Sequence, residues 1–357
     1  AGLMWNAYDA DGFVPSDKSL PRYKRDKPDD VLRIIVLGGS TLASFGSSPF
    51  DSIPGHLQRM LGNNGSDGDK KVRFEVINAG VGGYNSAQEY LYLISELVYY
   101  KPDIVVFYDG WNESINRHGH FSDATFAYLR KVKKFKPVPF SSVRTILHRD
   151  YNDHIDQSYT PTGAAVILKD AIGRWLSDKW LHTGIRDWGW KYRLRKNWKR
   201  FWKGIFGIFK KIEKRPSHVE AIKVDFDPRS LKVFEENIHR SAILAGLRGF
   251  KVLFALQPVI GVGSKSYAPG NEQNWANSEI GKAKILRRKR FYDIARPSLK
   301  ALAEEYGDRK NVCFADMSSA LIDVKETVYV DEGHLNSLGN RVVASAMIKQ
   351  LAKCDFF

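Results

Sequence analysis

The chain has 357 residues, 43% hydrophobic and 27% charged, a balance that excludes a disordered or fibrous protein and allows one elaborated domain or two. No uninterrupted apolar run reaches the roughly 18 residues needed to cross a membrane. The net charge of +15 is unevenly placed, because residues 174–215 carry 14 lysines and arginines against three acidic residues. This basic window predicts an acidic partner or surface for that part of the chain.

Apolar runs alternate with helical patterns along most of the chain. Residues 1–30 lack periodicity and are expected to form an extended lead-in packed on the surface. Buried strands are predicted at 31–37, 72–77, 103–108, 251–256 and 312–315, and helices at 52–61, 86–99, 229–247, 284–306 and 338–352. Strands separated by helices predict a doubly wound, five-stranded parallel sheet with helices on both faces.

The alternation stops after Asn112 and resumes near Pro228, which predicts a sheet domain of residues 31–113 and 228–357 with a large helical insertion, 114–227, after the third strand. Within the insertion, apolar residues recur at helical spacing from Trp198 to Ile212, with lysines and arginines between them. Residues 191–215 are therefore expected to contain a basic, aromatic amphipathic helix.

Three interpretations of residues 191–215 are open. The aromatic face packs on the sheet as a helical subdomain or lid, or the helix lies on an anionic membrane surface, or it binds an acidic polysaccharide. Nucleic acid is not expected, because no segment resembles a known nucleic-acid-reading module.

Three predicted strands end in turns rich in glycine and polar residues. The first is followed by Gly38-Gly39-Ser40-Thr41, the second by Asn78 to Ser86 with three glycines, and the third by Gly110-Trp111-Asn112-Glu113. The carboxyl ends of parallel strands meet at one edge, where ligands bind. Ser40 by itself fits a helix N-cap as well as a nucleophile. The spacings of phosphate-binding loops, dinucleotide-binding loops and the GxSxG elbow are all absent.

A fourth polar segment, Asp331-Glu332-Gly333-His334, precedes the last predicted helix. A carboxylate three residues before a histidine in a turn can orient the imidazole, so that the other ring nitrogen accepts a proton from a serine. Backbone N–H groups of the glycine turns and the Asn112 amide are suitable donors to an oxyanion.

The order Ser, Gly, Asn and Asp-x-x-His on successive segments resembles the SGNH, or GDSL-like, hydrolase family. The resemblance covers residues 31–112 and 229–353 and implies a flavodoxin-like SGNH fold. It implies that Ser40 is the nucleophile, His334 the base and Asp331 its orienting partner, and that the oxyanion donors are Ser40, Gly83 and Asn112. Further substrate contacts are expected from Gly39, Thr41, Tyr84, Trp111, Glu113 and Gln257.

The sequence departs from the family pattern at two positions: Gly39 replaces the usual acid before the serine, and Glu113 replaces the Asp after the third-block Asn. Gly-Gly-Ser-Thr variants are similar to bacterial members associated with cell-surface polysaccharides. The resemblance thus implies an esterase for acyl groups, most plausibly O-acetyl, on a carbohydrate, with no cofactor or metal. An O-acyltransferase with the same residues and a non-catalytic binding or scaffold protein of the same fold are the alternatives.

Location in the cell is expected to be periplasmic or extracellular, with membrane association through residues 191–215. The sequence begins without an initiator Met or an apolar leader, which leaves a removed signal peptide or anchor open. The two cysteines, Cys313 and Cys354, either pair or are two buried thiols.

Overall fold

The structure is a computed structural model, and it describes residues 9, 11–16, 23–62, 72–115 and 228–357. All of these lie in one compact unit of the chain, formed by residues 1–140 and 223–357. The predicted insertion, apart from its first two residues, lies outside the described residues, and with it the basic helix expected at 191–215.

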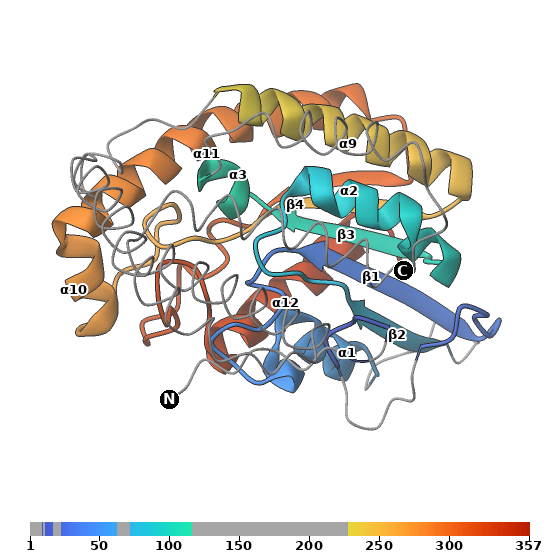
Figure 1. Ribbon diagram of the computed structural model, residues 1–357, viewed down its shortest axis with the longest axis horizontal. Helices are drawn as coiled ribbons and strands as arrows, with labels where there is room; N and C mark the ends of the chain where they lie inside the picture. The colour runs from blue at the N-terminus through green and yellow to red at the C-terminus, as the bar shows by residue number, and fades with distance from the viewer. Residues whose placement is uncertain (1–8, 10, 17–22, 63–71, 116–227) are drawn as a thin grey trace, which may run out of the picture. The chain divides into compact units, whose positions relative to one another are not determined.

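The centre of this unit is a parallel sheet of the strands predicted from the sequence (Figure 1). The strands are β1 (Val31–Gly38), β2 (Arg73–Asn78), β3 (Ile104–Asp109), β4 (Lys251–Leu256) and β5 (Val312–Asp316). Their spatial order, β2-β1-β3-β4-β5, is the flavodoxin-like doubly wound order. The predicted fold class is confirmed.

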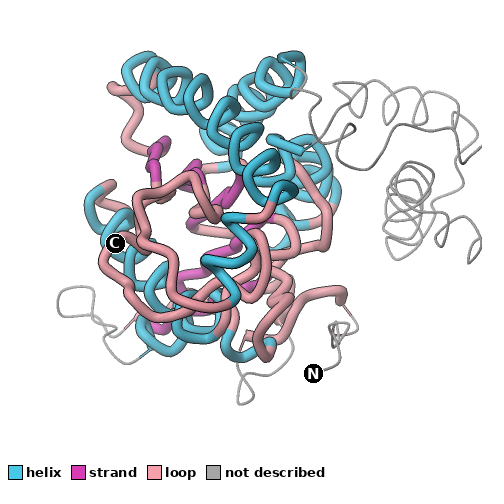
Figure 2. Tube along the Cα trace, turned by 90° about the vertical axis from the view of Figure 1, so that its left-hand side faces the viewer, coloured by secondary structure: helices cyan, strands magenta, loops and turns pink. Residues whose placement is uncertain are grey.

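The strand register brings the chemically important turns to one edge. Gly38 pairs with Tyr108, Asp109 with Leu256, and Leu256 with Asp316, so β1, β3, β4 and β5 end nearly level. The order reverses between β1 and β3, the position at which such sheets bind ligands. In Figure 2, which views the domain from the left-hand side of Figure 1, loops that follow the strands occupy the foreground.

Helices cover both faces of the sheet, as Figure 1 shows. One face carries α1 (Ile53–Gly62) and α12 (Ser337–Lys353), and the other carries α2 (Ser86–Ser95), α9 (Pro228–Arg248) and α11 (Glu279–Glu305). The short elements are η1 (Pro49–Asp51), η2 (Leu97–Tyr100), α3 (Trp111–Ile115) and α10 (Asn271–Asn277). Each face has its own buried apolar cluster, which explains why the central strands read as continuous apolar runs.

Two helix predictions differ from the structure in their bounds. The helix predicted at 86–99 ends at Ser95 and continues, after Glu96, as a 3-10 turn. The helix predicted from residue 284 begins at Glu279, where the Ser278 side chain accepts a hydrogen bond from the Gly281 N–H, and α10 precedes it. The start of α11 was missed because its polar first residues lack the apolar periodicity on which the prediction relied.

The lead-in is more deeply embedded than predicted. Phe13 is fully buried and packs edge-to-face against Tyr23 and Tyr100. The Tyr23 hydroxyl donates to the Val76 carbonyl at 2.9 Å, and Val14 forms a bridge with Asn78. The lead-in was expected to pack on the surface as an extended segment, and the part of it that contains Phe13 contributes to the core.

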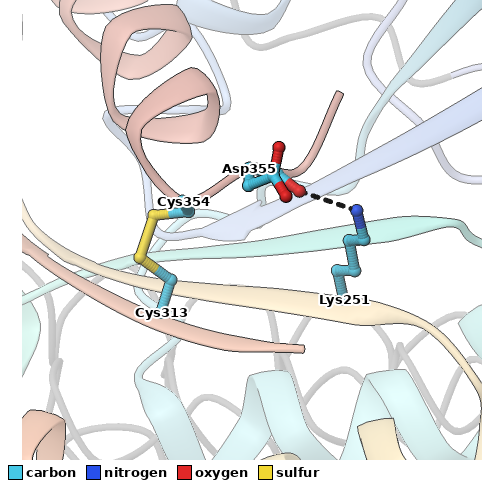
Figure 3. The surroundings of a disulfide bond; sticks show 4 residues. All are labelled: Lys251, Cys313, Cys354 and Asp355. Atoms are coloured by element: carbon cyan, nitrogen blue, oxygen red, sulfur yellow. Dashed lines mark hydrogen bonds between the residues drawn. A yellow bond between two sulfur atoms is a disulfide. The ribbon is translucent and has the colours of Figure 1, made fainter. Parts of the chain in front are cut away.

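Cys313 and Cys354 form a disulfide that ties the end of α12 to β5 (Figure 3). Their Cα atoms are 6.1 Å apart, and the Lys251 ammonium beside them donates to the Asp355 carbonyl at 2.8 Å. Of the two alternatives for the cysteines, the structure shows the paired one. Among the described residues, no helix is long and apolar enough for a membrane span.

Candidate active site

The turn after β1 presents Ser40 at the carboxyl edge of the sheet. The Gly39 carbonyl accepts hydrogen bonds from the N–H groups of Leu42 and Ala43, and the Ser40 carbonyl accepts one from Phe45 at 3.3 Å. Ser40 is half-buried, whereas the residues on both sides of it are buried. The turn therefore holds the serine in a fixed backbone frame and leaves it partly accessible.

Asn78, at the end of β2, holds the Ser40 turn in place by hydrogen bonds. Its side-chain amide donates to the Leu42 carbonyl at 2.8 Å, and its side-chain oxygen accepts from the Gly80 N–H at 3.0 Å. One buried side chain thus joins the Ser40 turn to the glycine turn after β2. The sequence showed Asn78 as a strand-end polar residue but gave it no role.

The second and third predicted blocks meet beside Gly39. The Asn112 side-chain amide donates to the Tyr84 carbonyl at 2.5 Å, and a Cβ at Gly39 would collide with the same amide nitrogen. Gly83 has a φ of 78°, a left-handed conformation that glycine adopts without the strain a side chain would add. Gly39, Gly83, Tyr84 and Asn112 are therefore neighbours.

Several donors at this place have unused capacity. Asn112 has a second amide hydrogen besides the one given to Tyr84. Among the described residues, the backbone N–H groups of Ser40 and Gly83 form no hydrogen bond. The residues predicted as oxyanion donors thus have N–H groups free to meet a ligand.

Asp331 and His334 form the predicted pair. His334 Nδ1 lies 2.6 Å from Asp331 Oδ2, and Asp331 Oδ1 accepts the N–H groups of Gly333 and His334, each at 2.9 Å. Burial raises the pKa of Asp331, but the hydrogen bond and charge of His334 outweigh it and the net pKa is lowered. Asp331 is therefore held as a carboxylate that fixes one nitrogen of the ring.

The other ring nitrogen, His334 Nε2, is buried and has no hydrogen-bond partner among the described residues. The ring stacks on Phe45, with centroids 5.4 Å apart, and meets Trp111 edge-on at 4.8 Å. Phe45 belongs to the Ser40 turn, and Trp111 directly precedes Asn112. The imidazole therefore lies between the two segments that carry Ser40 and Asn112. Phe45 had no distinguishing signal in the sequence.

Thr41 and Gln257 were expected to touch substrate, and both are buried. The Thr41 hydroxyl donates to Gln257 Oε1 at 2.9 Å, while the Gln257 carbonyl accepts from the Tyr292 hydroxyl at 2.8 Å. These bonds join the Ser40 turn to the end of β4. Their contact with a substrate stays a prediction, as it does for Gly39, Tyr84 and Trp111.

Glu113 was expected to contact substrate, and that contact stays a prediction. It is buried, and its two carboxylate oxygens accept the N–H groups of Ser86 at 2.8 Å and Gly110 at 2.9 Å. Both oxygens are thus used to tie the start of α2 to the end of β3. These contacts make Glu113 part of the support for Asn112, and none of them favours a place in a substrate pocket.

Glu113 belongs to a group of three buried acids with Glu89 and Asp109. Burial raises the pKa of all three, most strongly for Glu89 and Asp109, and the negative charges of the neighbouring acids raise the pKa of those two further. Buried carboxylates close to one another favour the protonated form. A group of acids with raised pKa therefore lies next to Gly110.

No protein-family model matches the chain, and no curated protein matches it. Solved structures similar to it include a lipolytic protein assigned to the G-D-S-L family from Desulfitobacterium hafniense DCB-2, with a TM-score of 0.41 and 10% identity over 89% of this chain and 99% of that one. A mutant of the acetylxylan esterase Axe2 from Geobacillus stearothermophilus has a TM-score of 0.41 and 10% identity, over 90% of this chain and 94% of that one. A two-domain esterase active on acetylated mannans has a TM-score of 0.40 and 14% identity, over 91% of this chain and 49% of that one.

The chain resembles the SGNH, or GDSL-like, hydrolases in its own features: an all-parallel sheet of flavodoxin-like order and the Ser, Gly, Asn and Asp-x-x-His segments. The assignment of chemistry to individual residues rests on the contacts within this chain.

Proposed function

We propose that the protein is a serine ester hydrolase with Ser40 as nucleophile, His334 as general base and Asp331 as its orienting carboxylate. One observation carries the proposal: His334 is fixed through Nδ1 by Asp331, while its buried Nε2 has no partner in the part of the chain that the structure describes, and its ring lies between the Ser40 turn and the Asn112 segment. A histidine held in this way has one nitrogen left for a serine proton.

In the proposed reaction, His334 Nε2 takes the hydroxyl proton of Ser40 as Oγ forms a bond to the acyl carbon. The carbonyl oxygen becomes an oxyanion and accepts hydrogen bonds from the N–H groups of Ser40 and Gly83 and the second amide hydrogen of Asn112. The ester C–O bond then breaks, and His334 protonates the leaving alkoxide. Water then gives a proton to His334 and attacks the acyl carbon. The bond between that carbon and Ser40 Oγ breaks, the acid leaves, and His334 returns the proton to Oγ.

The substrate proposed is an acyl ester on a carbohydrate, with O-acetyl as the acyl group. Its basis is the resemblance of the Gly-Gly-Ser-Thr motif to family members associated with cell-surface polysaccharides. An acceptor sugar hydroxyl in place of water would make the same residues an O-acyltransferase. Incubation with an activated acetyl donor and an acceptor oligosaccharide separates the two reactions, because only transfer produces an acetylated sugar.

A periplasmic or extracellular location is part of the proposal. The Cys313–Cys354 disulfide supports it, because disulfides persist in oxidising compartments and are rare in the cytosol. Attachment to an anionic membrane or acidic polysaccharide through residues 191–215 is a separate proposal from the basic, aromatic sequence. Co-sedimentation with anionic liposomes, with and without residues 191–215, tests it, and equal binding by both proteins rejects the membrane form.

The function is tested by hydrolysis of p-nitrophenyl acetate by the wild type, Ser40→Ala and His334→Ala. We expect turnover by the wild type and a loss of at least about 10³-fold in kcat for each variant, since the members of such a unit act together. Equal rates in all three proteins, or no turnover by the wild type, would favour the binding or scaffold alternative.

A further inference from the structure

The turn that carries Asp331 and His334 is held from outside by α11. Glu332, between the two predicted catalytic residues, forms ion pairs with Arg288 at 2.6 Å and Lys284 at 2.9 Å, which lie one helical turn apart on α11. The Arg288 side chain is 0% exposed, and its second terminal nitrogen lies 3.4 Å from the Glu332 carbonyl. Arg288 therefore contacts both the side chain and the backbone of the turn.

The Arg288 guanidinium also contacts two tryptophan rings. It lies over the Trp111 ring at 5.6 Å and over the Trp275 ring of α10 at 5.8 Å. Trp111 in turn meets the His334 ring, and a Cβ at Gly333 would collide with the indole. Arg288, Glu332 and Trp111 thus form a continuous set of contacts around His334.

These contacts have a chemical consequence. A guanidinium fully removed from water needs a partner, and Glu332 supplies the opposite charge; burial raises the pKa of Glu332, but the charges of Arg288 and Lys284 lower it overall. The planar guanidinium of arginine can bond a carboxylate through its edge while its face stacks on an indole, a geometry that the compact ammonium of lysine does not offer. Arg288 therefore restrains the turn of residues 331–334 through Glu332 and also through the Trp111 ring.

Resting on the proposed function, we propose that Arg288 and Glu332 are positioning residues that set the orientation of the His334 ring. They touch no reacting atom and act through the backbone of residues 331–334 and through Trp111. Their loss moves the base relative to Ser40, and a misplacement of about 1 Å can cost about 10²-fold in rate. The effect is therefore expected in kcat and not in KM.

The test compares Glu332→Gln, Arg288→Met and the double variant in steady-state hydrolysis of p-nitrophenyl acetate. Each single variant is expected to lower kcat by about 10- to 100-fold with KM within about 2-fold, and the double variant to be no slower than the slower single one, since both residues serve one contact. Arg296→Met is the matched control. Arg296 lies on the same helix, pairs with Asp316 at 2.9 Å and stacks on Tyr292, but it does not reach the turn.

Hydrogen exchange of the peptide spanning 329–336 provides a readout that does not depend on activity. Faster exchange there in Glu332→Gln, with unchanged exchange in Arg296→Met, supports the proposal even if the wild type hydrolyses no ester, in which case only the proposed function fails. Glu332 is partly exposed, so Glu332→Gln keeps the test valid if Arg288→Met does not fold. Wild-type kcat and exchange in Glu332→Gln would overturn the proposal, as would additive losses in the double variant.

Discussion

His334 takes its position from residues distant in the sequence. Asp331 holds one ring nitrogen, Phe45 and Trp111 cover the ring, and Arg288 contacts the turn from α11. Ser40 has a comparable dependence, because its turn is held by Asn78 and by the bond between Thr41 and Gln257. Each reacting group in the proposed mechanism is therefore oriented by side chains that take no part in the chemistry.

A substitution at Gly39 tests the proposed oxyanion donors. In Gly39→Ala the new methyl group collides with the Asn112 amide, a side-chain end that can move, so the fold is expected to survive while the donor is displaced. We expect kcat for p-nitrophenyl acetate to fall by about 10²- to 10³-fold, as for loss of one oxyanion donor. Gly246→Ala, in open space on α9, is the control and should keep wild-type kcat. Full activity in Gly39→Ala would remove Asn112 from the proposed oxyanion site.

Between elements, buried polar side chains join the sheet edge into one frame. Glu113 ties α2 to β3, and Glu89 of α2 and Asp109 of β3 are buried near it, each with a raised pKa. Because the folded protein keeps a proton that the unfolded chain releases above its ordinary pKa, near 4, stability from this pair declines as pH rises.

The change that tests this is Glu89→Gln, which keeps a neutral side chain of the same shape. Between pH 5 and the raised pKa, the wild-type free energy of unfolding should fall with pH by up to about 1.4 kcal/mol per unit for one retained proton, and the variant should show a flatter profile. Urea denaturation at a series of pH values measures both. Glu304→Gln, at an exposed acid on α11, is the control, and a wild-type slope retained in Glu89→Gln would rule out a proton held by Glu89.

The elements also show what sequence can predict here. All five strands were found because buried parallel strands read as apolar runs. The roles of Ser40, Gly83, Asn112, Asp331 and His334 follow from the resemblance of their segments to the SGNH pattern, and they stay a prediction. Arg288 and Phe45 were given no role, and the backbone contacts of Glu113 were not foreseen. Nothing in an isolated Arg, Phe or Glu indicates which distant group it meets, since that depends on how α11 and the loops pack.

Over the whole molecule, the described residues form one α/β unit closed at its C-terminal end by the disulfide between β5 and α12. The cysteines are 41 residues apart in sequence, so the bond restricts a long loop of the unfolded chain. Because the disulfide persists only under oxidising conditions, the stability it adds depends on the periplasmic or extracellular location proposed for the protein.

Replacement of both cysteines by alanine should lower the free energy of unfolding by about 4 kcal/mol, the chain-entropy value for a loop of this length. Urea denaturation of the wild type and Cys313→Ala/Cys354→Ala measures the loss, and the same experiment on the wild type with a reducing agent is the internal check. The double variant should keep wild-type kcat, because neither cysteine contacts the site segments. An unchanged midpoint on reduction would mean that the bond does not form in solution.

The central claim is that Ser40 is a nucleophile activated by His334. Labelling with a fluorophosphonate tests it most directly, because this reagent reacts with an activated serine and leaves an N-cap serine untouched. The account predicts one adduct per chain, mapped by peptide mass spectrometry to the peptide containing Ser40, and none in Ser40→Ala or His334→Ala. Absence of an adduct in the wild type, or an adduct that persists in Ser40→Ala, would contradict it.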